Sequence, residues 1–186
     1  MSRIGVFGGA FDPPHVAHLM SVTQVLAVAG LDRVLVVPCW GHGFGKPMSP
    51  FEDRLAMTRL AFGQFDPNRV MVSDIERDLQ TRYTIDLVAN LKIRLFDCDL
   101  VLIMGEDEWR ARERWHRWTD LAAMVPVTVV GREDGAGDVG CDVRLPDVSS
   151  TFIRATIARH GPDLCRNFVP AAALDYIREK GLYKAG

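Results

Sequence analysis

The stretch GGAFDPPHVAH, Gly8–His18, decides the fold of this chain because it joins a strand pattern to a helix pattern through a tight turn. The preceding run RIGVFG, Arg3–Gly8, is almost continuously apolar, which is typical of a strand buried on both faces. Gly8 and Gly9 lack Cβ atoms, so the backbone can turn sharply there and a ligand can approach it closely. The next segment, His15–Gly30, carries apolar residues at helical spacing and ends at a glycine. The sequence therefore predicts a strand–turn–helix unit.

The predicted helix brings two histidines to this turn. A helix N-terminus offers N–H groups without intrahelical partners and a positive dipole end, and both favour an anion. His15 and His18 are three residues apart, so they lie on the same face of the first turn. Two imidazoles there can donate hydrogen bonds to a phosphate, and a protonated one supplies charge to a transition state. We therefore predict a phosphate site at this turn.

Other interpretations of these residues stay open. The histidine pair could ligate zinc, although it has no adjacent acid or cysteine ligand and metalloprotease helices use i, i+4 spacing. It could also serve core packing alone, with the glycines needed only for the turn. A dinucleotide-binding loop is disfavoured because Gly5–Gly9 lacks the GxGxxG spacing. The segment WGHGFGKP, Trp40–Pro47, lacks the first glycine and the final hydroxyl of a Walker A loop.

Short β-branched runs alternate with helical patterns along the rest of the chain. Further strands are expected at Asp32–Pro38, Arg69–Asp74, Asp99–Gly105, Val125–Gly131 and Asp142–Pro146. Further helices are expected at Pro50–Phe62, Thr84–Leu95, Glu106–Ala123, Ser149–Gly161 and Pro170–Tyr183, with surface loops at Cys39–Pro50 and Arg132–Gly140. This order predicts an α/β fold, a doubly wound and mainly parallel sheet with helices on both faces, in a single domain spanning residues 1–186. Ligands bind such sheets at the carboxyl ends of the strands, where Gly8–Gly9, Gly105 and Gly131 fall.

Composition excludes several classes of protein. Of the 186 residues, 48% are hydrophobic and 25% are charged, which is ordinary for a globular domain. The formal net charge of −2 argues against a nucleic-acid partner. No apolar stretch approaches membrane-spanning length, and the N-terminus does not resemble a signal peptide. The four separated cysteines indicate reduced thiols, so we expect a cytoplasmic protein; its oligomeric state is not encoded in any pattern we identify.

A second anion-binding pattern lies near the other end of the chain. In VSSTFIR, Val148–Arg154, three hydroxyl residues open a predicted helix and an arginine follows one turn later. Ser149 or Ser150 can cap the helix, and the Arg154 guanidinium can bind phosphate oxygens in a fork. Alone, the pattern also fits an ordinary capped helix with a solvent-facing arginine. Together with the first turn, it suggests a polyphosphate held between two helix N-termini.

These motifs resemble those of a known superfamily. GGAFDPPHVAH is similar to the GGxF(N/D)PxHxGH signature of the nucleotidyltransferases, and SSTFIR is similar to their SSTxIR motif. Further stretches resemble bacterial nicotinate (nicotinamide) mononucleotide adenylyltransferases: YTID at Tyr83–Asp86, GED at Gly105–Asp107, RWHRW at Arg114–Trp118, and VPAAALDYIREKGLY at Val169–Tyr183. The resemblance runs in order over nearly the whole chain.

The resemblance implies a Rossmann-like nucleotidyltransferase fold and a reaction. ATP, with Mg²⁺, would give its adenylyl group to nicotinate mononucleotide, forming deamido-NAD and pyrophosphate for NAD synthesis. The acceptor phosphate would attack the α-phosphorus directly, so catalysis would consist of alignment and charge stabilisation. Nicotinamide mononucleotide, phosphopantetheine or another phosphate acceptor is an alternative, as is a nucleotide-binding module that has lost catalysis.

The same resemblance implies roles for individual residues, and no metal ligand from the protein. The expected catalytic residues are His18, His15, Lys46 and Arg154. The expected ATP-binding residues are Gly8, Gly9, Ala10, Phe11, Gly105, Asp107, Ser149, Ser150 and Thr151. The expected acceptor-binding residues are Asp12, Tyr83, Thr84 and Trp115. Because Trp109, Trp115 and Trp118 fall at helical spacing, we expect at least one of these tryptophans to lie in the core.

The chain departs from the family pattern at several positions. Ala17 stands where the family has a glycine between the histidines. Leu79, Thr81 and Arg82 replace residues of the segment that shapes the pyridine pocket, so the acceptor is less firmly predicted than the chemistry. The loop after Pro38 adds Trp40, His42 and Phe44 as further candidates for acceptor contacts.

Overall fold

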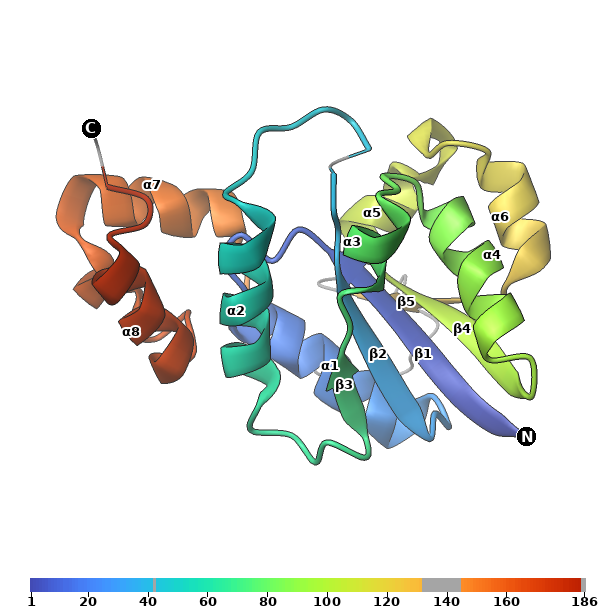
Figure 1. Cartoon of the computed structure of the whole chain (residues 1–186). Helices are drawn as coiled ribbons and strands as arrows, with labels where there is room; N and C mark the ends of the chain where they lie inside the picture. Colours follow the sequence, from blue (N-terminus) through green and yellow to red (C-terminus); the bar gives the residue numbers. More distant parts are fainter. Residues whose placement is uncertain (42, 132–144, 185–186) are drawn as a thin grey trace.

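A five-stranded parallel sheet forms the centre of the computed structural model, which describes residues 1–41, 43–131 and 145–184 (Figure 1). Its strands are β1 (Ser2–Gly9), β2 (Arg33–Pro38), β3 (Val70–Val72), β4 (Cys98–Gly105) and β5 (Val127–Val130). Their order across the sheet is β3-β2-β1-β4-β5, and every pair is parallel. The chain therefore winds outward in one direction from β1 to β3 and in the other from β4 to β5, which confirms the predicted doubly wound sheet.

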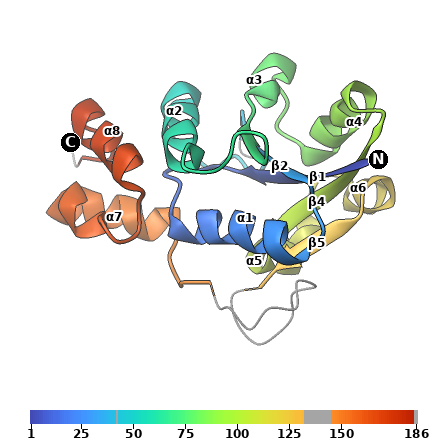
Figure 2. The same cartoon turned by 90° about the horizontal axis from the view of Figure 1, so that it is seen from below.

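Helices cover both faces of this sheet, as predicted. They are α1 (Val16–Val28), α2 (Phe51–Phe62), α3 (Ile75–Leu79), α4 (Thr84–Arg94), α5 (Glu106–Arg110), α6 (Trp118–Met124), α7 (Ser150–His160) and α8 (Ala171–Lys180), with 3₁₀ turns η1 (Arg112–Arg114) and η2 (Pro162–Cys165). Figure 2 shows α1 on one side of the sheet and α3 and α4 on the other. No described helix is long and apolar enough to cross a membrane.

The alternation of side chains along the strands divides the core into two clusters. In β2, Val34 and Val36 face the cluster that contains α1, α2, α7 and α8, whereas Leu35 and Val37 face the cluster that contains α3, α4 and α6. Successive side chains of a strand point to opposite faces, so a strand that is apolar at every position packs helices on both sides. The continuous apolar runs of the sequence correspond to this double burial.

The order of the strands indicates where a ligand site is expected on the sheet. The direction of winding changes between β1 and β4, whose Phe7 and Ile103 lie opposite each other in the ladder. Gly8 and Gly9 end β1, and Gly105 ends β4. In open α/β sheets a crevice forms outside the carboxyl ends at such a switch point. α7 and α8 lie beyond α2 in Figure 1, and α8 packs against α2.

Two details of the sequence prediction are wrong. The expected continuous helix at Glu106–Ala123 consists of α5, η1 and α6, and it is interrupted where Arg117 adopts a left-handed conformation at φ 53°. The short helix α3 was not expected. The expected loop at 132–140 and most of the expected strand at 142–146 lie outside the described residues, and Leu145 and Pro146 are not in a strand.

Candidate active site

Two adjoining cavities open at the carboxyl ends of β1 and β4. The first has a volume of about 390 Å³ and the second about 410 Å³. Their walls share Gly8, Gly9, Ala10, Ile103, Glu108 and Trp115. Two ligands bound in these cavities would therefore meet over the end of β1.

The first cavity collects most of the predicted site residues. All four predicted catalytic residues and all nine predicted ATP-binding residues line it: His15, His18, Lys46 and Arg154, with Gly8, Gly9, Ala10, Phe11, Gly105, Asp107, Ser149, Ser150 and Thr151. Of the predicted acceptor-binding residues, Tyr83 and Thr84 line the second cavity and Trp115 lines both. Asp12 lines the first cavity but not the second. Their functional roles remain predictions.

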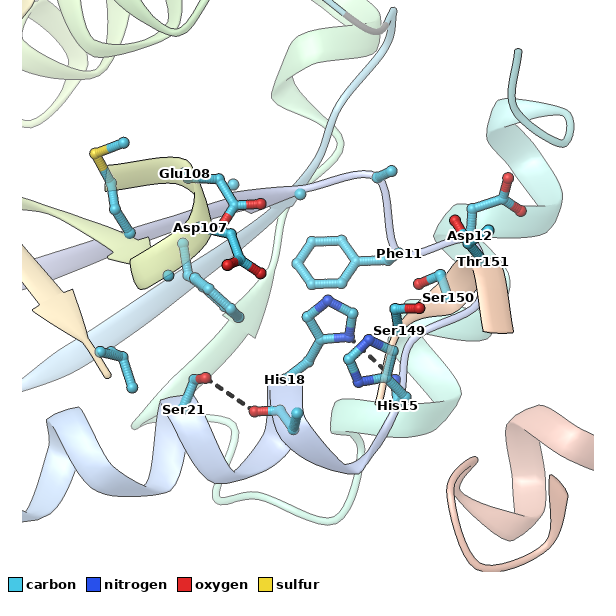
Figure 3. Close-up of a pocket in the computed structure, with 18 of the residues that line it drawn as sticks. Phe11, Asp12, His15, His18, Ser21, Asp107, Glu108, Ser149, Ser150 and Thr151 are labelled. Carbon is cyan, nitrogen blue, oxygen red and sulfur yellow. Dashed lines mark hydrogen bonds between the residues drawn. The ribbon is translucent and has the colours of Figure 1, made fainter. Parts of the chain in front are cut away.

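The two histidines lie in contact at the start of α1. Their rings stack, with centroids 3.7 Å apart and planes inclined by 27°. Figure 3 shows the two rings side by side. The backbone N–H of His15, the N-cap residue, donates a hydrogen bond of 3.1 Å to Nδ1 of His18. This bond requires a lone pair on Nδ1, so the hydrogen of the neutral His18 ring lies on Nε2. His18 is thereby set as an Nε2–H donor.

Phe11 fixes the turn that leads to these histidines. Its ring packs edge-on against His18 at a centroid distance of 4.9 Å and is almost fully buried. The Phe11 backbone has φ 48°, a conformation that side-chain-bearing residues rarely adopt. A Cβ atom on Gly9 would lie only 3.0 Å from the Phe11 ring, so a side chain there would displace the ring by a few tenths of an ångström.

The N-terminus of α7 meets the same turn, as the pairing of motifs predicted. Ser149 caps the helix, accepting a hydrogen bond of 3.2 Å from the backbone N–H of Phe152. The Ser150 hydroxyl donates to the carbonyl of Pro13 at 2.9 Å. Figure 3 shows Ser149 and Ser150 beside His15, with Asp107 and Glu108 across the cavity. Two helix N-termini therefore face one cavity, which is the arrangement that binds a polyphosphate.

Asp12 is held by protein groups. Its carboxylate accepts a hydrogen bond of 2.7 Å from the Tyr183 hydroxyl and one of 3.1 Å from the backbone N–H of Ser49. The Asp12 side chain is buried, and Nη1 of Arg154 lies 3.8 Å from it. The carboxylate thus joins the turn after β1 to the C-terminal segment and to the start of α2.

Arg54 of α2 also joins the turn after β1 to the start of α2. It is only 1% exposed, and it donates hydrogen bonds of 2.9 Å to the carbonyls of Ala10 and Ser49. Nothing in the sequence around Arg54 separates it from an ordinary solvent-facing arginine of an amphipathic helix. Neither Arg54 nor Tyr183 was predicted from the sequence as a residue of the site.

The second cavity combines aromatic and charged groups. Its lining includes Trp115, and His116 stacks on Tyr83 at a centroid distance of 4.2 Å. Glu76, another residue that was not predicted, is buried and accepts a hydrogen bond of 2.8 Å from the backbone N–H of Trp40. Burial raises the pKa of Glu76 to about 7, against smaller opposing effects of that hydrogen bond and of Arg54.

The three tryptophans do not share one helical face, because the helix expected there is broken. Trp109 lies on α5, Trp118 begins α6, and Trp115 follows η1. All three pack against the second core cluster, and Trp118 contacts both of the others edge-on. Of the three, only Trp115 lines the cavities.

Known proteins share the fold of this chain and most of its sequence pattern. A family model described as cytidylyltransferase-like matches residues 6–160, which is most of the chain. In a solved structure of the nicotinic acid mononucleotide adenylyltransferase of Plasmodium falciparum, complexed with NaAD, 98% of each chain superposes with a TM-score of 0.80 at 18% identity. This likeness confirms the predicted Rossmann-like nucleotidyltransferase fold.

Proteins of similar sequence identify the family more closely. A protein of Anaeromyxobacter sp. (strain K), named as a probable nicotinate-nucleotide adenylyltransferase, is 40% identical over 98% of this chain and 97% of its own. A protein of the same name from Myxococcus xanthus is 36% identical over 97% of this chain and 94% of its own. The chain therefore belongs to the nicotinate-nucleotide adenylyltransferases of the cytidylyltransferase-like family.

Proposed function

We propose that this chain transfers the adenylyl group of ATP to nicotinate mononucleotide, giving deamido-NAD and pyrophosphate. The observation that carries the proposal is the junction of the two cavities. One has a histidine pair and two helix N-termini, the other has Trp115 and Tyr83, and they meet over Gly8 and Gly9. A donor and an acceptor held there would have their reacting phosphates side by side, which is the main requirement of phosphoryl and nucleotidyl transfer.

In this proposal the first cavity holds ATP. The backbone after β1 and the N-termini of α1 and α7 bind the triphosphate through N–H groups. Gly105 and Asp107, at the end of β4, meet the adenosine ribose, whose hydroxyls can donate to a carboxylate. A Cβ on Gly105 would lie 2.7 Å from a carboxylate oxygen of Glu108, so a side chain there would disturb this wall.

The transfer itself is an in-line displacement at the α-phosphorus. An oxygen of the acceptor 5′-phosphate forms the new P–O bond while the bond from the α-phosphorus to the α,β-bridging oxygen breaks, and its electrons leave with pyrophosphate. The Nε2–H of His18 donates to an oxygen of the α-phosphate, where negative charge accumulates. Lys46 and Arg154 bind the departing phosphates, and His15 supports His18 by contact.

The chain's described residues contain no group of three His, Cys, Asp or Glu side chains that could hold a metal ion. We propose that Mg²⁺ enters with ATP, bound mainly by the triphosphate. Its contribution is to neutralise phosphate charge. The protein's own part is to present hydrogen-bond donors to the remaining oxygens.

In the second cavity, Trp115 stacks on the pyridine ring and the Tyr83–Thr84 backbone meets the ring substituent. We propose small-molecule partners alone for this chain, with no nucleic acid and no membrane, and a single functional domain over residues 1–186. The described cysteines are free thiols, which supports our proposal of a cytoplasmic location.

Pyrophosphate release from Mg-ATP tests the proposal, with nicotinate mononucleotide, nicotinamide mononucleotide and phosphopantetheine as parallel acceptors. We expect turnover with the nicotinate acceptor to exceed the others. Turnover with another acceptor alone would keep the chemistry but overturn the proposed substrate. ATP binding without turnover in any reaction would overturn the proposed enzyme activity.

A further inference from the structure

The second cavity contains an arginine that departs from the family pattern. Arg82 immediately precedes Tyr83, the N-cap residue of α4, and lines the cavity with it. The other charged residues in the lining are Arg114, Glu76 and Glu108. Among the described residues, Arg82 is therefore one of two arginines in the cavity assigned to the acceptor.

The two cations differ in their contacts. The Arg114 guanidinium lies over the Phe44 ring, 5.0 Å from its centroid, and is engaged in a cation–π contact. Arg82 makes no hydrogen bond and no ion pair with any residue that the structure describes. The Glu76 carboxylate in the same lining is buried and accepts a hydrogen bond from the Trp40 backbone. The fork of Arg82 is thus available to a ligand.

The stem of Arg82 is confined by the loop after β2. A Cβ on Gly41 would lie 3.3 Å from the Arg82 Cβ and 3.8 Å from its Nε, and a Cβ on Gly43 would lie 3.3 Å from the Arg82 carbonyl oxygen. The loop backbone therefore packs closely on Arg82, and a side chain at either glycine would need Arg82 to shift by a few tenths of an ångström. The loop thus contacts the stem of Arg82, while the residue remains exposed at the edge of the second cavity.

We infer that Arg82 binds the ring carboxylate of the acceptor and so selects nicotinate over nicotinamide mononucleotide; this rests on the proposed function. Of the two cavities, Arg82 lines the second and not the first, which places it at the acceptor's ring end rather than beside the histidines and the α7 N-terminus. Its exposed side chain also lines a separate pocket at the start of α4. A guanidinium pairs with a carboxylate through two charge-assisted hydrogen bonds, whereas a carboxamide carries no charge and offers one acceptor atom. The two acceptors otherwise carry the same ribose and phosphate.

The test compares kcat/KM for both pyridine acceptors in wild type, Arg82→Gln and Arg82→Lys. In Arg82→Gln we expect a loss of about tenfold or more with nicotinate mononucleotide and a change within about twofold with the nicotinamide form. Arg82→Lys keeps the charge without the fork, so its preference falls between the two. Direct binding of nicotinate mononucleotide should weaken by the same factor. Arg94→Gln, at the exposed far end of α4, is the matched control and leaves both acceptors unaffected.

Two results would overturn the inference while leaving the proposed function intact. An unchanged ratio of kcat/KM values in Arg82→Gln would show that the carboxylate is recognised elsewhere. An equal loss with both acceptors would show that Arg82 binds their common phosphate or ribose. Wild type that turns over neither pyridine acceptor would instead overturn the proposed function, and the inference with it. Binding of ATP, measured in each variant, verifies that the fold is retained.

Discussion

Nη1 of Arg154 donates a hydrogen bond of 2.6 Å to the backbone carbonyl of Asp12, and so joins the start of α7 to the turn that follows β1. Nη2 of the same guanidinium lies 3.4 Å from the Thr151 hydroxyl, within its own helix. Arg154 therefore holds the two helix N-termini in a fixed relation as well as lining the cavity between them. Together with the Ser150–Pro13 hydrogen bond, Arg154 thus connects the two helix N-termini that we propose bind the triphosphate.

Replacing Arg154 tests this double role. In Arg154→Ala we expect kcat/KM for ATP to fall by about 10- to 100-fold, because a charge-assisted contact is lost and α7 keeps the Ser150–Pro13 hydrogen bond to the turn without that of Arg154. Arg154→Lys should recover part of the activity, since an ammonium can still donate to the Asp12 carbonyl. Steady-state kinetics measure both effects. Arg159→Ala, an exposed arginine of the same helix, is the control; an equal loss there would contradict the assignment.

His18→Ala removes the Nε2–H donor that we place at the α-phosphate. We expect kcat to fall by about 10²- to 10³-fold with a much smaller change in ATP affinity, because the hydrogen bond strengthens as charge develops in the transition state. Single-turnover kinetics and equilibrium ATP binding separate the two quantities. His160→Ala, exposed at the end of α7, should leave both unchanged. Retention of near-normal turnover by His18→Ala would favour a packing role for the histidine.

Replacing Trp115 should affect mainly acceptor binding, whereas replacing Trp118 should affect mainly stability. Trp115 lines both cavities, so Trp115→Ala should raise KM for the acceptor by about tenfold or more through loss of ring stacking. Trp118 packs edge-on against both neighbouring tryptophans and lies against the second core cluster, so Trp118→Ala should lower the free energy of unfolding by about 2–3 kcal/mol. Chemical denaturation and acceptor titration in both variants measure this division. The reverse pattern would show that the stacking tryptophan is Trp118.

The sheet could be predicted from the sequence because its signals are local. A continuous apolar run such as Asp99–Gly105 indicates a strand buried on both faces, and the alternation of strands with helices then gives parallel order. The proximity of Gly8–His18 to Val148–Arg154 could also be predicted, because both patterns place a helix N-terminus at the carboxyl edge of the sheet.

The parts that could not be predicted depend on contacts between distant residues. The Tyr183 hydroxyl reaches Asp12 across 171 positions of the chain, and no local pattern encodes that distance. The sequence pattern predicts a surface position for Arg54, yet carbonyls of Ala10 in the turn after β1 and of Ser49 before α2 allow it to be buried. The break between α5 and α6 occurs at Arg117, without a glycine or proline to mark it.

Tyr183→Phe measures how much the hydrogen bond to Asp12 contributes to the free energy of unfolding. Burial, followed by the neighbouring Asp12 carboxylate, raises the pKa of Tyr183, so its hydroxyl remains a donor at all ordinary pH values. We expect the variant to lose about 1–2 kcal/mol of unfolding free energy, because the buried carboxylate then lacks one of its donors. Tyr176→Phe removes a comparable hydroxyl–carboxylate bond, of 2.8 Å to Asp53, at a less enclosed site. It should lose less than about 0.5 kcal/mol. Equal losses in the two variants would argue against a special role for Asp12.

Glu76 should make stability depend on pH in the direction opposite to most carboxylates. Burial raises its pKa from an ordinary value of 4.5 to about 7, so the folded chain keeps a proton that the unfolded chain releases between these pH values. The free energy of unfolding contributed by this group is complete below pH 4.5 and declines as pH rises to about 7. The decline is at most about 1.4 kcal/mol per pH unit.

Glu76→Gln isolates this effect, because glutamine keeps an oxygen that can accept from the Trp40 N–H but does not titrate. We expect the variant to equal wild type near pH 4.5 and to become more stable than wild type above about pH 7, as measured by denaturant unfolding across that range. Glu179→Gln, on the exposed side of α8, should retain the slope of wild type. If Glu76→Gln also retained that slope, Glu76 would be ionised in the folded chain throughout. The loop that begins at Trp40 would then be held by a buried carboxylate rather than by a neutral carboxyl group.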